Sequence, residues 1–269
     1  VAPGRTAAVE CLVHYDCGRI YRRRFGSEPI MFDRNADQWT EALADRMEQI
    51  YPGPMDAATA VIGFLNGCLI FDGRANRGAI YLFYAKTALH AQATLWKLVF
   101  VFVCLAMAGK SRIMVHGAGI KRRRGGGGYL FLGRSGAGKS TIVALSPGEV
   151  ALSDDATLIE AGENGFRIHA TPYTQTGIAR ERRKRCRLQR ESLRRIVFLH
   201  QAAATRMEPR ERHYACMELL TCHVHFFGLM EEALKRRVFD LCHRICGAVP
   251  AADLYFHRDG GFWQLVAAE

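Results

Sequence analysis

The chain has 269 residues, of which 49% are hydrophobic and 23% are charged. This length allows one large domain or two small ones with an apolar core, and the composition excludes a largely disordered chain. The formal net charge of +11 favours an acidic partner, which could be a nucleotide, an acidic peptide, nucleic acid or a membrane surface.

The first 85 residues predict a small α+β portion. Apolar positions from Asp37 to Ile50 recur at helical spacing, and Asn66-Gly67 is typical of a two-residue hairpin turn. Short alternating runs predict strands at residues 9–14, 20–25, 59–65, 68–72 and 79–84. This portion carries no sequence motif typical of a catalytic or binding site, so its role stays open.

From residue 86 onward helices and strands alternate, which predicts an α/β domain over residues 86–269 with a boundary near Ala85. Helices are expected at 86–108, 139–145, 209–220 and 229–247. Strands are expected at 112–120, 129–132, 150–152, 156–161, 166–170 and 196–199, followed by a closing hairpin of 254–257 and 262–266.

The longest apolar stretch, Leu98 to Gly109, has 12 residues, whereas a membrane span needs about 20. No signal-peptide pattern is visible at the start. We therefore expect a cytoplasmic protein that does not span a membrane. The nine cysteines contain no C-x-x-C, which favours reduced thiols. A less favoured alternative is a zinc site drawn from Cys216, Cys222, His223, His225, Cys242, His243 and Cys246.

A complete G-x-x-x-x-G-K-[ST] motif lies between the predicted strand 129–132 and the predicted helix 139–145. Its residues are Gly133, Arg134, Ser135, Gly136, Ala137, Gly138, Lys139 and Ser140. The glycines let backbone N–H groups turn inward around a phosphate. Lys139 can contact the outer phosphates, and the Ser140 hydroxyl can bind Mg²⁺. The motif predicts a site for a nucleoside triphosphate, ATP with Mg²⁺.

Two acidic residues, Asp154 and Asp155, follow the predicted strand 150–152. A carboxylate at a strand end beside a phosphate loop is a usual second anchor for Mg²⁺. Adjacent side chains on an extended chain point opposite ways, so one carboxylate can face the metal and the other an incoming hydroxyl. The alternative is a purely structural role, because Ser-Asp-Asp also favours a turn. His116, on the strand before the loop strand, is by itself more often structural than catalytic.

The order of these segments resembles the catalytic domain of HPr kinase/phosphorylase, which shares a P-loop fold with the ATP-dependent phosphoenolpyruvate carboxykinases. The resemblance rests on Met114 to Ala118, on Leu130 to Thr141 and on Ser153-Asp154-Asp155, and it covers about residues 95–269. It is nearest to short relatives that modify peptides, including kinases that tailor lasso peptides. It implies a mixed sheet with flanking helices.

The resemblance also implies roles for individual residues. The nucleotide segment would extend from Gly133 to Thr141, and His116 would lie close to the terminal phosphate. Asp154 would accept the proton of a substrate serine, and Asp155 would hold metal together with Ser140. Thr141 stands where the bifunctional HPr enzymes usually carry an acidic residue, and their second signature is not recognisable here. We therefore expect neither phosphorylase activity nor HPr as the substrate.

The run from Arg180 to Arg195 is rich in arginine. It is either a solvated face or a clamp for phosphate or an acidic peptide, because arginine binds both in a bidentate way. It lacks interleaved aromatic residues, so nucleic-acid binding is not expected. The main interpretation is a kinase of a serine in a peptide or small protein. The alternatives are a small-molecule kinase and a non-catalytic ATP-binding regulator. Whether the chain forms a homo-oligomer stays open.

Overall fold

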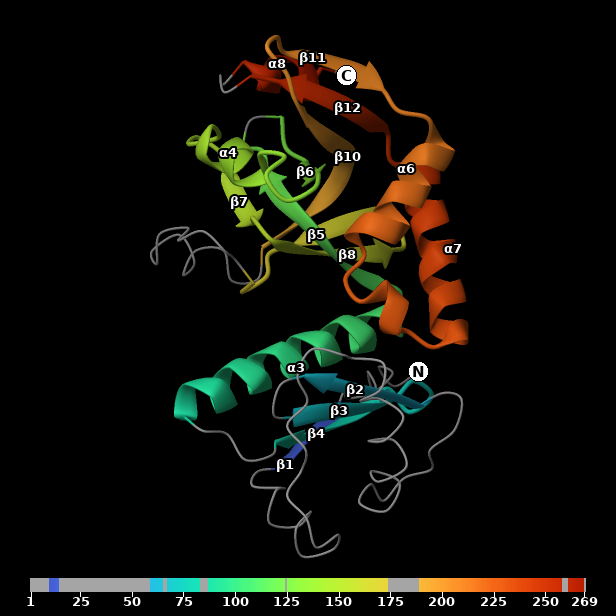
Figure 1. Ribbon diagram of the computed structural model, residues 1–269. Coiled ribbons are helices and arrows are strands. Elements are labelled where there is room, and N and C mark those ends of the chain that lie inside the picture. Colours follow the sequence, from blue (N-terminus) through green and yellow to red (C-terminus); the bar gives the residue numbers. More distant parts are fainter. Residues whose placement is uncertain are drawn as a thin grey trace, which may run out of the picture. The chain divides into compact units, whose positions relative to one another are not determined.

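The computed structural model of the chain describes residues 10–14, 59–64, 67–82, 87–123, 125–173, 189–257 and 261–268 (Figure 1). The chain divides into two compact units, each with its own sheet. The first unit comprises Val1–Lys110 and Gly228–Lys235, and the second comprises Ser111–Phe227 and Arg236–Glu269.

The first unit contains a four-stranded sheet in the order β1-β4-β3-β2. The strands are β1 (Glu10–His14), β2 (Thr59–Phe64), β3 (Gly67–Asp72) and β4 (Arg77–Leu82). This confirms the strands expected after residue 59, with Gly67 paired in β3 rather than placed in the turn. β1 pairs with β4 in parallel. The expected strand 20–25 and helix 37–50 lie outside the described residues.

Helix α3 (Ala88–Ala108) confirms the long helix expected before the second sheet. The Thr87 hydroxyl caps it by accepting a hydrogen bond from the His90 N–H at 3.2 Å. Its buried side chains include Leu98 and Phe102, and the Phe102 ring meets Phe71 of β3 edge-on at 6.1 Å between centroids. The first compact unit thus includes α3, and the predicted domain boundary near Ala85 stays a prediction.

By length and composition alone, α3 could cross a membrane. The core helix of a globular unit passes the same test. Here the helix packs against β3 and β4 of its own unit, which gives its apolar residues a partner without a bilayer. That the chain does not span a membrane stays a prediction.

The second unit contains an eight-stranded mixed sheet in the order β11-β12-β10-β6-β5-β8-β9, with β7 paired to β5. Its first strands are β5 (Arg112–Lys121), β6 (Gly128–Leu132), β7 (Val150–Ser153) and β8 (Ala156–Gly162). The others are β9 (Gly165–His169), β10 (Arg190–Gln201), β11 (Arg206–Pro209) and β12 (Ala251–Phe256). β10 runs parallel to β6 and β12, and β5 runs antiparallel to β6 and β8. The expected α/β class is thereby confirmed.

Two long strands change partners along their length. β5 pairs with β8 over residues 112–116 and with β6 over residues 117–121. β10 pairs with β9 at residues 190–192 and with β6 from Leu193 onward. The strand path β10-β6-β5-β8-β9 therefore returns to β10. On β5 these partners lie along opposite edges: β8 and then β7 pair along one edge, and β6 pairs along the other from Gly117 onward.

Short helices flank this sheet. They are α4 (Lys139–Ala144), α6 (Arg212–Glu218), the π-helical turn η1 (Leu219–His223) and α8 (Phe262–Val266). The 3-10 turn η2 (Phe227–Leu229) and α7 (Glu232–Ala248) contain residues of both units. Figure 1 shows α4 on one side of the central strands β5, β6 and β10, and α6 on the other.

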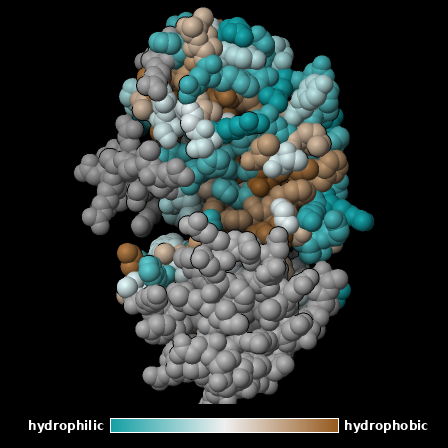
Figure 2. Space-filling model, in the orientation of Figure 1, coloured by the Kyte–Doolittle hydropathy of each residue, from teal (hydrophilic) through white to brown (hydrophobic). Residues whose placement is uncertain are grey.

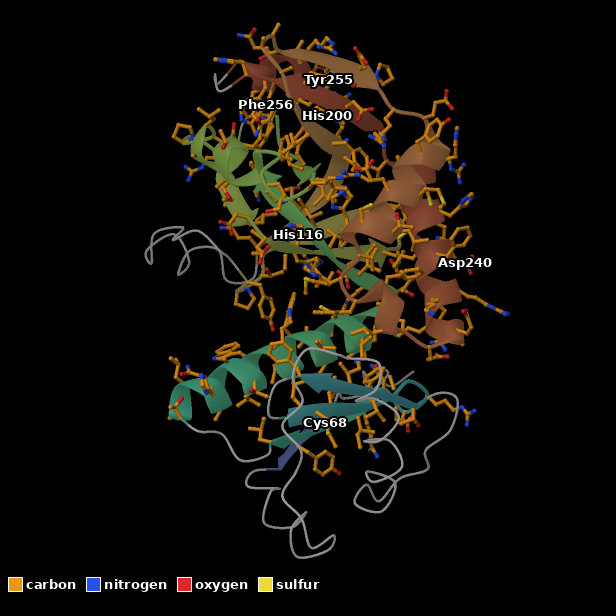
Figure 3. The ribbon with its side chains drawn as sticks, viewed as in Figure 1. Cys68, His116, His200, Asp240, Tyr255 and Phe256 are labelled. Carbon is orange, nitrogen blue, oxygen red and sulfur yellow. The ribbon has the colours of Figure 1, made fainter. Side chains whose placement is uncertain are left out.

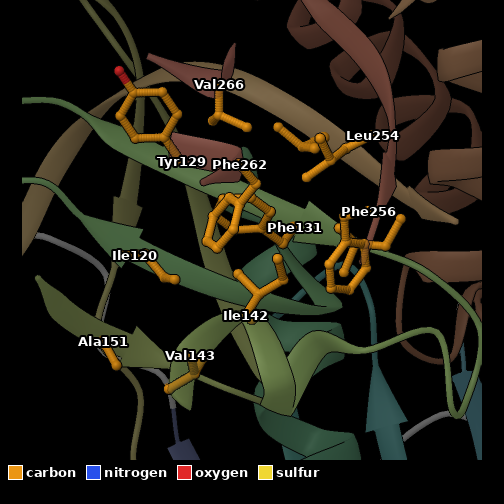
Figure 4. Packing of buried hydrophobic residues seen from close by; sticks show 13 residues of the cluster. Ile120, Tyr129, Phe131, Ile142, Val143, Ala151, Leu254, Phe256, Phe262 and Val266 are labelled. Carbon is orange, nitrogen blue, oxygen red and sulfur yellow. The ribbon is translucent and has the colours of Figure 1, made fainter. Parts of the chain in front are cut away.

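The core of the second unit lies between the sheet and the helices α4 and α8 (Figure 4). Phe131 of β6 is fully buried and meets Phe262 and Trp263 of α8 edge-on at 6.2 and 5.6 Å between ring centroids. The Trp263 N–H donates to the Ser146 hydroxyl at 2.8 Å, which satisfies the polar atom of the indole. Burial of one such aromatic side chain contributes roughly 1.5–3 kcal/mol.

The closing hairpin expected at 254–257 and 262–266 is wrong. Residues 262–266 form the helix α8, in which the buried Phe262 and Val266 lie four positions apart on one face. The run Phe-Trp-Gln-Leu-Val is too short for its periodicity to separate a strand from a helix. β12 instead pairs with β10 in parallel and with the unanticipated strand β11.

Figure 2 shows that much of the visible face of the second unit is hydrophilic, with hydrophobic residues gathered over its lower part. The exposed large apolar side chains of this unit include Tyr214 and Met217 on α6 and Phe239 on α7. Scattered exposed apolar residues are normal on protein surfaces and need no partner to explain them.

Candidate functional site

The glycine-rich segment connects β6 to α4, as the sequence predicted. Gly136 and Gly138 have φ of 81° and 109°, a region that residues with a side chain rarely adopt. A Cβ atom on Gly133 would lie 2.7 Å from Cβ of Ala137, and one on Gly138 would lie 2.5 Å from the Phe256 ring. Glycine is therefore required at these positions by conformation and by space.

Lys139 is folded into this loop. Its ammonium group donates to the carbonyl oxygens of Gly133 at 2.7 Å and Arg134 at 3.2 Å, and only 8% of the residue is exposed. Burial lowers the pKa of Lys139, and the negative charge of Asp155 partly offsets this effect. The lysine is thus a buried cation within the electrostatic reach of Asp155. A phosphate beside it would further stabilise its charged form.

The outer part of the loop is exposed and is tied to β10. Arg134, Ser135 and Ser140 are exposed, whereas Thr141 is half-buried. The Gln201 side chain, at the end of β10, donates to the Gly136 carbonyl oxygen at 2.6 Å. This bond fixes one peptide group of the loop with its oxygen directed toward β10.

Ser153 shapes the turn that carries the two acidic residues. Its hydroxyl oxygen accepts from the backbone N–H groups of Asp155 at 3.3 Å and Ala156 at 3.1 Å, and the hydroxyl donates to the Tyr173 carbonyl at 3.0 Å. Asp154 is buried, with 3% of the residue exposed, whereas 23% of the Asp155 side chain is exposed. The two carboxylates therefore have different surroundings.

His116 and Asp155 form a pair. Nδ1 of His116 lies 3.0 Å from a carboxylate oxygen of Asp155. The Gly117 N–H donates to the Asp155 carbonyl at 2.9 Å, so the backbones of β5 and of the Asp turn are joined at the same place. Figure 3 labels His116 on β5. Of the residues predicted from the sequence, the structure thus brings Lys139, Asp155 and His116 to one region.

Two histidines that the sequence offered only as zinc ligands also reach this region. His223 Nδ1 is 3.2 Å from the His116 carbonyl oxygen. The ring of His225 meets the ring of His116 edge-on at 5.7 Å between centroids. Within the described part of the chain, no three His, Cys, Asp or Glu side chains are grouped so that they could hold a metal ion. Cys216 is instead hydrogen-bonded to Cys246, and burial raises the pKa of both thiols.

A second polar network lies behind these histidines. Arg210 donates to Glu218 and, at 2.6 Å, to Asp253, and its guanidinium lies 4.2 Å above the Phe198 ring. His200 Nε2 is 2.6 Å from the same Asp253 oxygen. Glu218 also lies 3.5 Å from His223 Nε2. This network links β10, β12 and α6 to the histidine beside β5.

Protonation of two histidines, the buried His223 and the half-buried His169, is expected to destabilise the fold at mildly acidic pH. Burial lowers the pKa of His223 and of His169. Where the folded pKa is depressed, the unfolded chain binds more protons, so the contribution to stability is present above the ordinary histidine pKa of about 6.5 and is lost as pH falls. The melting temperature should therefore decrease from about pH 7.5 to about pH 5.5, an interval above the ordinary pKa values of Asp and Glu. Thermal unfolding followed by circular dichroism measures it.

The variant His169→Gln, His223→Gln provides the comparison for this prediction. Its melting temperature should fall less steeply over the same interval than that of the parent. A parent melting temperature that rises as the pH is lowered would contradict the prediction.

The comparisons with known proteins give one family. The model for the SynChlorMet cassette protein ScmC matches residues 87–268, which is well over half of the chain. The chain belongs to the ScmC family. No match is found among curated proteins.

The ScmC match includes every residue of the candidate site. It begins at the cap of α3 and continues through the glycine-rich loop, His116 and the two acidic residues to the end of α8. The described strands β1 to β4 lie before it. The assignment of residues 86–269 to one catalytic domain stays a prediction.

Proposed function

We propose that this ScmC family member is an ATP- and Mg²⁺-dependent kinase with the P-loop fold of the HPr kinase catalytic domain. It transfers the γ-phosphoryl group to a hydroxyl, that of a serine in a peptide or small protein. The observation that supports this most is the proximity of Lys139, Asp155 and His116. Lys139 comes from the start of α4, Asp155 from the turn after β7, and His116 from β5. Asp155 contacts His116 and lies within electrostatic reach of Lys139.

The chemistry assigns one task to each group. Backbone N–H groups of residues 133–139 bind phosphate oxygens, and the Lys139 ammonium contacts the outer phosphates. One carboxylate of the Asp pair takes the proton of the acceptor hydroxyl as the new O–P bond forms and the bond from phosphorus to the ADP oxygen breaks. ADP leaves with the electron pair of that bond. His116 orients Asp155 through their 3.0 Å contact.

The donor groups at this site suit Mg²⁺. Ser140 offers a hydroxyl and Asp155 a partly exposed carboxylate, which are hard oxygen ligands. Mg²⁺ is commonly held by one or two protein oxygens together with phosphate oxygens and water, so a cluster of three protein ligands is not needed. Bound there, the ion would neutralise charge on the transferred group. Asp154 is more buried, which leaves Asp155 as the more accessible carboxylate for either role.

The acceptor is expected to be a peptide, and the net charge of +11 favours one of acidic character. The arginine-rich run that motivates this expectation lies mostly in residues 174–188, outside the described part of the chain. Arg190, Arg194 and Arg195 are described, and the Arg195 guanidinium donates to the Val266 carbonyl at 2.9 Å. That arginine stabilises the end of α8, so the clamp hypothesis depends on the remaining arginines.

A transfer assay with γ-labelled ATP and serine-containing peptides, with and without Mg²⁺, tests the proposal. We expect Mg²⁺-dependent label on peptide hydroxyls. Transfer to small hydroxyl compounds but to no peptide would favour the small-molecule kinase. Stabilisation by ATP and Mg²⁺ without transfer to any acceptor would favour the non-catalytic regulator, against which the intact set Lys139, Ser140, Asp154 and Asp155 argues. No thermal stabilisation at millimolar nucleotide would overturn the nucleotide site.

A further inference from the structure

The segment from Leu219 to Phe226 has unusual backbone geometry. It begins with the π-helical turn η1, a rare conformation that is frequent at functional sites. It ends at Phe226, whose φ of 58° is uncommon for a bulky residue. Such conformations persist only where the surrounding contacts hold them, so the contacts of this segment show what it is built to do.

Those contacts are with β5, beside the candidate site. Val224 forms a bridge with Val115, and the His225 N–H donates to the Met114 carbonyl at 2.9 Å. Val115 also pairs with Thr157 of β8, so the segment occupies the opposite edge of β5 from β8. β6 pairs along that edge from Gly117 onward. The segment therefore lies along the same edge of β5 as β6, next to the end of β6 that leads into the glycine-rich loop.

The ladder between β5 and β8 determines where the His116 carbonyl points. The Gly117 N–H donates to the Asp155 carbonyl at 2.9 Å, while His116 is paired with Ala156. In an antiparallel ladder this makes His116 a non-hydrogen-bonded position, whose own N–H and C=O point away from the partner strand. The His116 carbonyl therefore faces the edge occupied by the segment, and it meets Nδ1 of His223 there at 3.2 Å.

His223 is placed to act as a donor at this carbonyl. Only 2% of the residue is exposed. A carbonyl oxygen can only accept, so Nδ1 of His223 carries the hydrogen. Its other nitrogen faces Glu218 at 3.5 Å, and the Phe198 ring lies 6.1 Å away between centroids. Nδ1 of the imidazole thus contacts β5, and Nε2 faces α6.

We propose that His223 is a positioning residue for phosphoryl transfer: its Nδ1–H holds the His116 carbonyl and thereby sets the pairing of His116 with Asp155. This inference rests on the proposed kinase function. The edge contact of the His225 ring with the His116 ring restrains the same side chain from another direction. The bland alternative is a buried histidine whose hydrogen bonds merely satisfy the core.

Two amide variants separate these roles in the full chain. In His223→Asn, the side-chain N–H₂ reaches the place of Nδ1 and keeps the donor for the His116 carbonyl. In His223→Gln, the N–H₂ reaches the place of Nε2, toward Glu218, and leaves the carbonyl without its donor. Both variants remove the imidazole and retain a polar amide, so a loss of packing affects both.

We expect turnover close to that of the parent for His223→Asn. For His223→Gln we expect a decrease on the order of 10²-fold, because small misplacements of reacting groups have effects of this size. The affinity for ATP with Mg²⁺ and the melting temperature should stay alike in the two variants. Equal turnover in both, or a loss of ATP affinity together with turnover in His223→Gln, would overturn the proposal.

A second readout needs no phosphoryl acceptor. In protein labelled with ¹³C-histidine, the ring resonances of His116, assigned by their absence in His116→Gln, should coincide in the parent and His223→Asn. They should be displaced in His223→Gln. If no acceptor is ever phosphorylated, the kinase proposal fails while this measurement still decides the positioning role. Equal displacement in both variants would overturn that role even in an active kinase.

Discussion

Replacement of Lys139 by alanine is expected to abolish detectable phosphoryl transfer and to leave the fold intact. The Lys139 ammonium is the buried cation of the glycine-rich loop, and no other described lysine lies in that loop. Groups aimed at charge that develops in a transition state contribute about 10²–10³-fold or more each. The measurement is transfer from γ-labelled ATP by parent and variant at saturating Mg²⁺.

The stability of the variant should change little. Lys139 gives up two hydrogen bonds to loop carbonyls, which contribute roughly 1 kcal/mol each. The same substitution removes a buried charge, whose desolvation opposes folding. Because these effects oppose each other, the melting temperature in the absence of nucleotide should stay close to that of the parent.

Two further substitutions show whether phosphoryl transfer requires the charge of Lys139 or the shape of its ammonium group. Lys139→Met keeps the apolar stem and removes the charge, and it should behave like the alanine variant. Lys139→Arg keeps the charge but presents a planar fork in a loop shaped for an ammonium, and it should restore little activity. Transfer at the parent level by Lys139→Met would remove Lys139 from the mechanism.

Nucleotide binding gives an independent control. A ligand at about 100 times its Kd stabilises a folded protein by about 2.7 kcal/mol. The parent should therefore melt at a higher temperature with ATP and Mg²⁺, and the alanine variant should lose most of that increase. If ATP and Mg²⁺ raise the melting temperatures of the parent and of Lys139→Ala equally, other groups of the protein bind the nucleotide.

The local part of this site could be predicted from the sequence because its determinants are neighbours in the chain. The positions of Gly133, Gly136 and Gly138 are set by turn conformation and close packing inside one short loop. Such requirements leave a pattern of residue types at fixed spacing. The strand before the loop and the helix after it were predicted for the same reason.

The contact between His116 and Asp155 was not predicted from the sequence. Family resemblance placed His116 close to the terminal phosphate, but its 3.0 Å contact with Asp155 depends on how β5 pairs with β8. Strand partners are selected by long-range packing, for which one sequence carries little signal. No sequence pattern indicated that β5 pairs with β8 along one edge and with the loop strand β6 along the other.

The role of the histidines on η1 and just after it was missed for a similar reason. His223 and His225 were considered only because they fall among cysteines, as members of a less favoured zinc site whose spacings miss the usual ligand patterns. The structure directs both toward His116, across more than one hundred residues of sequence. The π-helical turn that orients them has no residue signature. The sequence signal that could have found them is the closeness of His223 and His225 in the chain, considered as partners for His116.

Substitution of the two acidic residues is expected to separate the base from the metal ligand. Following the family order, Asp154 is assigned as the base and Asp155 as a ligand of Mg²⁺. Asp154→Asn should then lower turnover by about 10²–10⁴-fold, the usual effect of removing a general base, without changing the dependence on Mg²⁺. Asp155→Asn should raise the Mg²⁺ concentration needed for half-maximal rate.

Both substitutions preserve size, which matters because Asp154 is 3% exposed, and neither removes the backbone bond between Asp155 and Gly117. Ser153→Ala provides a matched control at the same turn. It removes the hydroxyl that accepts from the Asp155 and Ala156 N–H groups and leaves both carboxylates in place. A loss in Ser153→Ala comparable with that in the aspartate variants would assign the effect to the turn and not to the carboxylates.

The different burial of the two carboxylates also allows the reverse assignment, with Asp155 as the base and Asp154 acting with the metal. Asp155 has 23% of its side chain exposed and carries the contact with His116, so it is open to a hydroxyl as well as to a metal. If Asp155→Asn loses turnover at every Mg²⁺ concentration while Asp154→Asn mainly shifts the Mg²⁺ dependence, Asp155 is the base and Asp154 acts with the metal. Steady-state rates across a Mg²⁺ titration distinguish the two. Parent-level turnover in both variants would show that neither carboxylate takes part in the transfer, and the catalytic assignment would be wrong.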